Sequence, residues 1–171
     1  MSTNEKAREL EEKGKAEYEW GTLWPHYHKE KMNWAMGFRT KGDVDILFLS
    51  GSTGRDPFED APCRSPEDER KGVGKVVSSS MREQTRQCWM DIKNNLESMG
   101  ASLKNIVMLR YYIRNREEVF DMRDEMYKFF REFEPDLLEH PRPATLLRGV
   151  GIDLADMKIE IEAWAVVPRK R

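Results

Sequence analysis

The residues best suited to acid–base chemistry are two carboxylates near the C-terminal end of the chain. Glu160 and Glu162 lie two positions apart in residues 158–167, where apolar and polar residues alternate. This alternation is typical of a β-strand with one buried face, so both glutamates are expected on its polar face. Like charges at this spacing repel each other, and each then needs a cation or a hydrogen-bond donor nearby. The pair therefore suits proton transfer; the alternative is a salt bridge to a neighbouring strand or subunit.

Arg123 is the cation whose position most needs an explanation. It lies one helical turn after Val119 and beside Met126 and Tyr127, at the edge of an apolar stripe. A partly buried guanidinium needs a partner, which we expect to be a ligand carboxylate or Glu160. The alternative is that its aliphatic part packs on the helix while the charged end reaches water.

Five strands would hold or flank these residues, in the overall order β-β-α-β-α-β-β. They are expected at residues 34–39, 46–50, 106–114, 144–150 and 158–167. Gly42 lies in the turn of a hairpin between the first two, and residues 153–156 form the turn between the last two. In the third and fifth strands, odd-numbered and even-numbered positions are expected on opposite faces.

Two helices are predicted from capping residues and apolar spacing. Ser80 and Glu83 form a capping box before the first helix, and Gly100 ends it. Residues 115–118 cap the second helix, and Pro135 closes it. The apolar stripes are Met81, Thr85, Cys88, Ile92, Leu96 and Met99 in the first helix, and Val119, Met122, Met126, Phe129, Phe130 and Phe133 in the second. Because two helices cover only one face of a mixed sheet, this α+β protein would turn its other face to water or another subunit.

The composition limits the partners of the protein. Charged residues make up 35% of the chain and its mean hydropathy is −0.78, but 29 Lys and Arg nearly balance 31 Asp and Glu. We therefore expect no nucleic-acid partner and no membrane partner, and no apolar run suits a membrane span or a signal peptide. Cys63 and Cys88, which lack metal-ligand spacing, indicate a reduced cytoplasmic protein.

The chain divides into an extension and one domain. Residues 1–30 are predicted to be a charged and then aromatic extension, and residues 31–168 a domain that contains a long loop at residues 55–79. His26 and His28 lie in the extension. Two histidines without a third ligand nearby are weak evidence for a metal, so we expect no metal site.

Several short segments together resemble the reactive intermediate deaminase family, also called Rid or YjgF-like. They are Ser-Gly at residues 50–51, Gly-Ala-Ser-Leu at 100–103, Arg-Pro-Ala at 142–144 and Glu-Ile-Glu-Ala at 160–163. The likeness covers residues 34–168. It implies a chorismate-mutase-like α+β fold, a homotrimer whose sheets form an inner barrel, and one ligand site at each subunit interface.

The resemblance also implies a reaction and a set of site residues. Archetypal members hydrolyse enamine or imine products of pyridoxal-phosphate enzymes to a keto acid and ammonia, and no cofactor is implied for the deaminase itself. Glu160 falls on the glutamate that acts through water, Ser50 on a serine of the site wall, and Trp34 approximately on the site aromatic. Thr145 stands where archetypal members have the arginine that grips the substrate carboxylate.

The missing arginine directs the expectation toward a branch of the family. Arg123, Arg110 or Arg148 would replace the lost cation, and Arg148 is the weakest candidate because it should point to the face opposite Thr145. Branches without this arginine include 2-aminomuconate deaminases, so a 2-aminomuconate-like substrate or another small imino acid is expected. The competing hypothesis is a non-catalytic ligand-binding or regulatory trimer. Ribonuclease activity, attributed to some relatives, is disfavoured by the near-neutral charge.

Overall fold

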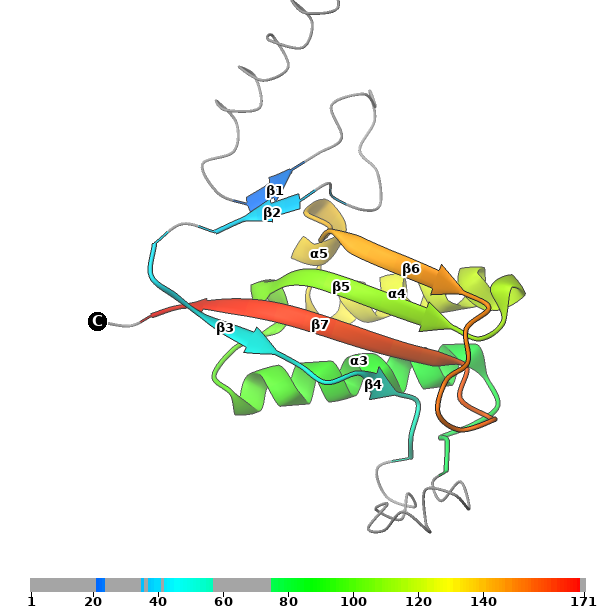
Figure 1. Cartoon of the computed structure of the whole chain (residues 1–171). Helices are drawn as coiled ribbons and strands as arrows, with labels where there is room; N and C mark the ends of the chain where they lie inside the picture. Colours follow the sequence, from blue (N-terminus) through cyan, green and yellow to red (C-terminus); the bar gives the residue numbers. More distant parts are fainter. Residues whose placement is uncertain (1–20, 24–34, 36, 41, 57–74, 170–171) are drawn as a thin grey trace, which may run out of the picture.

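A mixed β-sheet with two long helices on one face forms the body of the protein (Figure 1). The structure, a computed structural model, describes residues 21–23, 35, 37–40, 42–56 and 75–169. The sheet contains five strands in the order β3-β7-β5-β6, with β4 also paired to β7. The strands are β3 (Val44–Phe48), β4 (Ser52–Thr53), β5 (Ile106–Ile113), β6 (Ala144–Arg148) and β7 (Ile159–Pro168). The expected α+β arrangement, with one face of the sheet covered by helices, is confirmed.

The central strand β7 follows the predicted alternation. Ile159, Ile161, Ala163 and Ala165 are completely buried, whereas Glu160 and the other even-numbered residues up to Val166 are half-buried on the opposite face. Strand β7 is antiparallel to β3, β4 and β5, and β6 runs parallel to β5. The apolar face of β7 therefore meets the helices, and its polar face is the open side of the sheet.

The predicted hairpin of the first two strands is wrong. Strand β2 (Gly37–Arg39) pairs with β1 (Gly21–Leu23) in a separate two-stranded sheet, whereas β3 pairs with the edge of β7. The glycine at position 42 has a φ of +86°, as a turn requires, but the turn separates two sheets instead of closing a hairpin. Likewise β6 and β7 follow each other in the chain, yet β5 lies between them (Figure 1). Local turn residues indicate where a chain reverses, but they do not determine which strand it then joins.

The two main helices begin and end close to the expected residues. Helix α3 spans Met81–Ser98, and Ser80 Oγ accepts a 3.4 Å hydrogen bond from the amide of Glu83. The reciprocal half of the predicted capping box is replaced, because the Ser80 amide donates to Ser78 Oγ at 2.9 Å. Gly100, with a φ of +73°, follows the helix as predicted.

Helix α4 spans Val119–Phe133 and is followed by the short helix α5 (Asp136–Glu139). The N-cap residue of α4, Glu118, lies within the predicted cap at residues 115–118, but its side chain makes no capping hydrogen bond. Residues 116–118 form a 3-10 turn, η2 (Arg116–Glu118), directly before the helix. A second 3-10 turn, η1 (Leu103–Asn105), leads into β5. In the part of the chain that the structure describes, no helix combines the length and apolarity that crossing a membrane requires.

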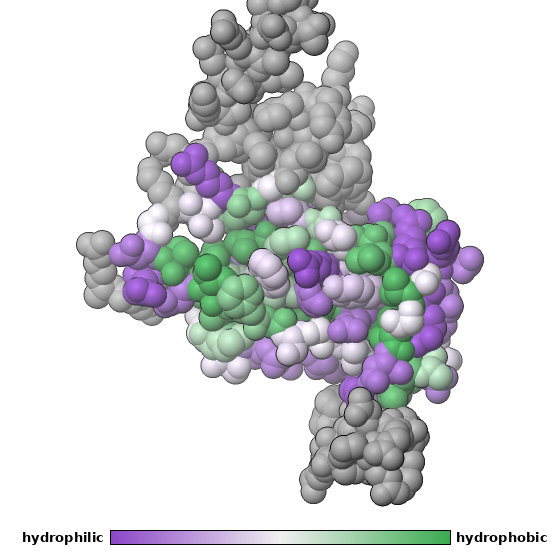
Figure 2. All heavy atoms as spheres, in the orientation of Figure 1, coloured by the Kyte–Doolittle hydropathy of each residue, from purple (hydrophilic) through white to green (hydrophobic). Residues whose placement is uncertain are grey.

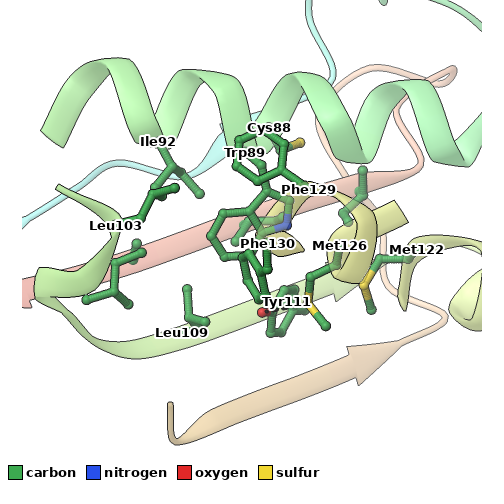
Figure 3. Close-up of a cluster of buried hydrophobic side chains, with 14 of the residues drawn as sticks. Cys88, Trp89, Ile92, Leu103, Leu109, Tyr111, Met122, Met126, Phe129 and Phe130 are labelled. Atoms are coloured by element: carbon green, nitrogen blue, oxygen red, sulfur yellow. Dashed lines mark hydrogen bonds between the residues drawn. The ribbon is translucent and has the colours of Figure 1, made fainter. Parts of the chain in front are cut away.

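The core lies between the helices and the sheet, around Trp89 (Figure 3). The Trp89 ring is fully buried and contacts Phe130 edge-on, with 4.7 Å between the ring centroids. The predicted stripes are buried except for Met99, which is 45% exposed at the helix end, and Phe133, which is half-buried. The core contains Trp89 in addition to the predicted stripe of α3. Ile106 is buried against expectation, because a bulge between Ile106 and Met108 shifts the alternation of β5.

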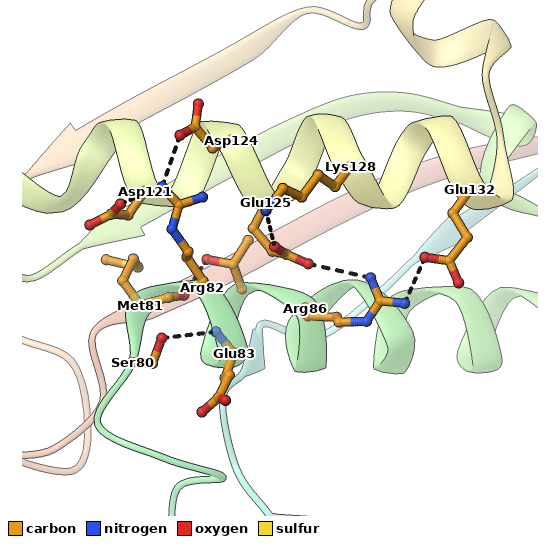
Figure 4. Close-up of polar contacts among 11 residues, drawn as sticks. Ser80, Met81, Arg82, Glu83, Arg86, Asp121, Asp124, Glu125, Lys128 and Glu132 are labelled. Atoms are coloured by element: carbon orange, nitrogen blue, oxygen red, sulfur yellow. Dashed lines mark hydrogen bonds and ion pairs between the residues drawn. The ribbon is translucent and has the colours of Figure 1, made fainter.

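Ion pairs join the outer surfaces of α3 and α4 (Figure 4). Arg82 pairs with Asp121 at 2.7 Å and with Asp124 at 2.8 Å. Arg86 pairs with Glu132 at 2.7 Å and with Glu125 at 3.3 Å. Ion pairs this exposed to solvent contribute little to stability. Their main consequence is that these four acids of α4 are neutralised on the side that faces α3.

Candidate functional site

Glu160 lies near the start of β7 on the open face of the sheet, between Thr53 of β4 and Tyr112 of β5. Its carboxylate lies against the backbone of Gly51: a Cβ atom at this glycine would come within 1.9 Å of Glu160 Oε1. No side chain fits at position 51 unless the carboxylate moves. Ser50, the predicted wall residue, directly precedes this glycine and is exposed. Ser50, Gly51 and Glu160 therefore form one local cluster.

The electrostatics of the cluster favour a protonated Glu160. Partial burial, together with the charges of Glu162 and Asp153, raises the pKa of the Glu160 carboxyl above its usual value. No cation among the described residues forms an ion pair with Glu160. An acid with a raised pKa and no ion-pair partner among the described residues is a suitable proton donor and acceptor.

Glu162 has a different environment. Arg110 Nη1 donates a hydrogen bond to Glu162 Oε2 at 3.3 Å, and the Tyr112 hydroxyl donates to Glu162 Oε1 at 3.0 Å. The salt bridge that the sequence left open for both glutamates is thus formed by Glu162 and not, within the described chain, by Glu160. The Glu162 charge remains close enough to raise the pKa of Glu160.

Two residues that the sequence analysis did not identify hold the segment before β7 in place. The Arg114 guanidinium donates to the carbonyls of Ile152, Leu154 and Met157 at 2.6–2.8 Å. Gln84 is fully buried: its amide nitrogen donates to the carbonyls of Ser78 (2.8 Å) and Asp156 (2.9 Å), and its oxygen accepts from the Lys158 amide (2.8 Å). A polar residue within the buried stripe of α3 was the signal that could have identified Gln84.

Thr145 and Arg110 also lie on the open face. Thr145 is aligned with Arg110, and Arg110 with Glu162, in one row across β6, β5 and β7. The Arg110 guanidinium stacks over the Trp164 ring at 5.3 Å, and Phe48 contacts the same ring edge-on at 5.2 Å. Figure 2 shows this face, on which a hydrophobic region over β3 and the adjoining part of β7 borders a polar strip. Arg148 is aligned with the buried Ile113, on the face opposite Thr145, as expected.

Arg123 lies on the other, helix-covered side of the sheet. It lines a cavity of about 220 Å³ between α4, α5 and the strands β5 and β6. The lining residues are Leu109, Tyr111, Met122, Arg123, Met126, Tyr127, Phe130, Leu137, Leu138, Pro141, Arg142, Ala144 and Leu146. Arg123 and Glu160 are therefore on opposite faces of the sheet and do not meet within one chain.

Some predicted residues lie outside the described chain. They include Trp34, His26, His28, Cys63 and most of the loop at residues 55–79. In the ranges that the structure does describe, no group of three or more His, Cys, Asp or Glu side chains is placed to hold a metal ion.

The protein is an α+β protein whose mixed sheet is covered by helices on one face. On the other face the Glu160 carboxylate lies against Gly51. The model of the family described as endoribonuclease L-PSP matches residues 40–167. The chain therefore belongs to this family, which includes the Rid and YjgF proteins.

Relatives from several organisms agree with this assignment. The chain is 29% identical over 96 residues to the mitochondrial protein mmf1 of Schizosaccharomyces pombe. This match covers 54% of each chain, so it spans about half the length of that relative. It is 29% identical over 121 residues to a RutC family protein of Pyrococcus horikoshii, covering 71% of this chain and 79% of the relative. It is 25% identical over 95 residues to a 2-iminobutanoate/2-iminopropanoate deaminase of Dermatophagoides farinae. This match covers 56% of this chain and 68% of the relative.

Solved structures support the fold. The crystal structure of YyfB from Yersinia pestis, described as a protein of unknown function of the conserved Rid protein family, superimposes with a TM-score of 0.64. The match covers 85% of this chain and 97% of YyfB, at 17% identity. This likeness concerns the fold alone.

Proposed function

We propose that this protein is a hydrolytic deaminase of small imine or enamine carboxylates. The observation that carries the proposal is Glu160, a partly buried carboxylate with a raised pKa and no described ion-pair partner, held against Gly51. The name of the mite relative, a 2-iminobutanoate/2-iminopropanoate deaminase, supports the same class of reaction.

The proposed reaction uses Glu160 as both base and acid. The enamine first tautomerises to an imine, and Glu160 then accepts a proton from a water molecule that attacks the C=N carbon. Glu160 returns that proton to the nitrogen, which gives a carbinolamine. Glu160 then accepts the proton of the new hydroxyl group and passes it to the amino nitrogen, so that the C–N bond breaks as the C=O bond forms, and ammonia leaves with a keto acid as the second product. Ser50 would contribute a hydrogen bond to the wall of the site and not act as a nucleophile, since no histidine lies near it in the sequence to activate its hydroxyl.

The grip on the substrate carboxylate is proposed to come from a second copy of the chain. Arg110 lies on the same open face of the sheet as Glu160, but it already pairs with Glu162. Arg123 has no described ion-pair partner, and it lies on the face of the sheet opposite Glu160. A homotrimer in which the Arg123 side of one copy meets the Glu160 side of the next would unite the two groups at each subunit interface. Thr145 and Arg110 would then line the open-face wall of this site.

Ammonia release tests the proposal. The purified protein should release ammonia from 2-iminopropanoate or 2-iminobutanoate generated in situ by an amino-acid dehydratase, faster than spontaneous hydrolysis. Glu160→Gln should reduce the catalysed rate at least about 100-fold, in the range expected for a general acid–base residue. The control Glu117→Gln changes an exposed glutamate outside the site and should retain the rate.

Two further measurements test whether 2-aminomuconate is the substrate and whether the protein binds ligands without catalysis. If 2-aminomuconate is the substrate, Arg123→Ala should impair its turnover; undiminished turnover would rule out the role given to Arg123. Calorimetric titration of imino-acid analogues distinguishes the non-catalytic alternative, because binding without any ammonia release from the panel would favour a ligand-binding trimer.

A further inference from the structure

The charge balance of α4 leaves its half-buried arginine, Arg123, without a carboxylate. Asp121, Asp124, Glu125 and Glu132 all pair with Arg82 or Arg86 of α3 (Figure 4). The residues three and four positions from Arg123 in α4 are Val119, Phe120, Met126 and Tyr127, none of which is acidic. Arg123 points away from the acidic side of its helix, and no residue in the described ranges forms an ion pair with it. A half-buried guanidinium in this setting lacks the anion that it requires.

The other charged or hydroxyl groups of the cavity that have printed contacts are committed to the protein. Arg142 donates hydrogen bonds to the carbonyls of Ile106 (2.6 Å), Lys104 (3.1 Å) and His140. The Tyr111 hydroxyl donates to Met126 Sδ at 3.3 Å. Arg142 therefore holds the chain together, and Arg123 is the cation of the lining that is available to a ligand.

The remaining wall of the cavity is apolar and large enough for a ring. Phe130, Leu137, Leu138 and Leu146 line it, together with the methionines of α4. An apolar cavity of about 150 Å³ binds benzene. At about 220 Å³ this cavity has room for an aromatic ring or a branched chain and a short polar group.

We infer that this cavity binds a monocarboxylate with an aromatic or branched apolar body, whose carboxylate is held by the Arg123 guanidinium. A single guanidinium binds a carboxylate through two parallel hydrogen bonds, and the apolar wall excludes water from the rest of the ligand. This inference rests on the proposed function only where the bound ligand is the substrate. In that case the cavity selects imino acids with bulky apolar side chains over 2-iminopropanoate. Binding itself needs no reaction.

Calorimetric titration of the full chain with 3-phenylpropanoate tests the inference, because this compound has no C=N bond. We expect it to bind at least tenfold more tightly than acetate, which lacks the apolar body, and than 3-phenylpropanamide, which lacks the charge. Arg123→Gln should weaken 3-phenylpropanoate binding at least tenfold. Arg131→Gln, which removes an exposed arginine of the same helix outside the cavity, should leave it unchanged.

A second variant reports on the apolar wall. Ala144→Leu adds a side chain at an exposed edge of the cavity and should weaken 3-phenylpropanoate binding, with thermal unfolding confirming the fold. Equal binding of the acid and its amide, or unchanged binding in Arg123→Gln, would overturn the inference, as would the absence of binding at millimolar ligand. Because 3-phenylpropanoate has no C=N bond, its binding is measured apart from any reaction, so a failed deaminase assay and a failed binding assay remain distinguishable.

Discussion

At the scale of single residues, the proposed chemistry depends on how a glutamate is placed beside a glycine. Glu160 and Glu162 have the same side chain and lie on the same face of β7, yet only Glu162 has an arginine and a tyrosine as partners. The backbone at Gly51 leaves room for the Glu160 carboxylate at the edge of β4. The contrast between the two acids follows from their neighbours and not from their spacing in the sequence.

Gly51→Ala should reduce ammonia release at least about tenfold, a loss of about 1.4 kcal/mol of transition-state stabilisation. The added Cβ would lie 1.9 Å from Glu160 Oε1 and must displace the carboxylate. Steady-state assays measure the effect. Gly151→Ala is the control, since nothing lies within 4 Å of a Cβ at that glycine, and it should retain activity. Equal rates in the two variants would mean that the position of the carboxylate is unimportant.

Glu160 also makes a prediction about stability and pH. Burial and neighbouring acids raise its pKa in the folded protein above the ordinary 4.5, so the folded state binds the proton more tightly than the unfolded state. Stability should therefore fall as pH rises from 4.5 through the raised pKa. Glu160→Gln should be more stable than the parent at pH 8, by less than about 1 kcal/mol because the carboxylate is partly solvated, and equal below about pH 4. Denaturant unfolding at both pH values measures this; a difference that persists at low pH would contradict it.

At the scale of elements, sequence patterns predicted helices and strands well but strand partners poorly. Capping residues and apolar spacing located α3 and α4, since both signals are local. The hairpin assigned to residues 34–50 was wrong, because β3 pairs with the long edge of β7 and β2 pairs with β1. The bulge in β5 that buries Ile106 has no local signal in the sequence.

The link between α3 and the start of β7 depends on Gln84. Gln84→Ala should lower the free energy of unfolding by about 1–3 kcal/mol, because it removes a fully buried side chain and leaves partly buried backbone groups of Asp156 and Lys158 without their partner. The activity should fall as well, since Lys158 lies two residues before Glu160. Denaturant titration measures the change. Gln87→Ala is the matched control: Gln87 lies on the same helix, half-buried, and bonds to Asp91, so its loss should cost under about 1 kcal/mol.

At the scale of the whole molecule, the open face of the sheet carries the feature that favours assembly. Phe48 is 65% exposed and Ile46 56% exposed on β3, beside the Trp164 ring. Apolar side chains clustered on one face of a sheet are typical of an interface. The helix-covered side also exposes Phe120, at 70%, and this residue lies on α4, away from the open face.

Phe48→Lys should dissociate the proposed homotrimer, because a charge would replace an apolar contact at the interface. Sedimentation velocity should give a trimer for the parent and smaller species for the variant. Met99→Lys changes an apolar residue that is 45% exposed at the C-terminal end of α3, away from both Phe48 and Arg123, and should leave the trimer intact. A parent that sediments as a monomer, or a Met99→Lys variant that dissociates like Phe48→Lys, would contradict an interface on the open face.

The sequence by itself determined the class of fold, the buried face of β7, the two helices and the acid at position 160. These depend on residue periodicity and short motifs, which act over a few positions of the chain. Tertiary structure decided that Glu162 is neutralised by Arg110, that Gln84 and Arg114 hold the approach to β7, and that Arg123 lines a cavity on the face opposite Glu160. Residues far apart in sequence meet only when strand order and helix packing are set, so their partners cannot be deduced from local spacing.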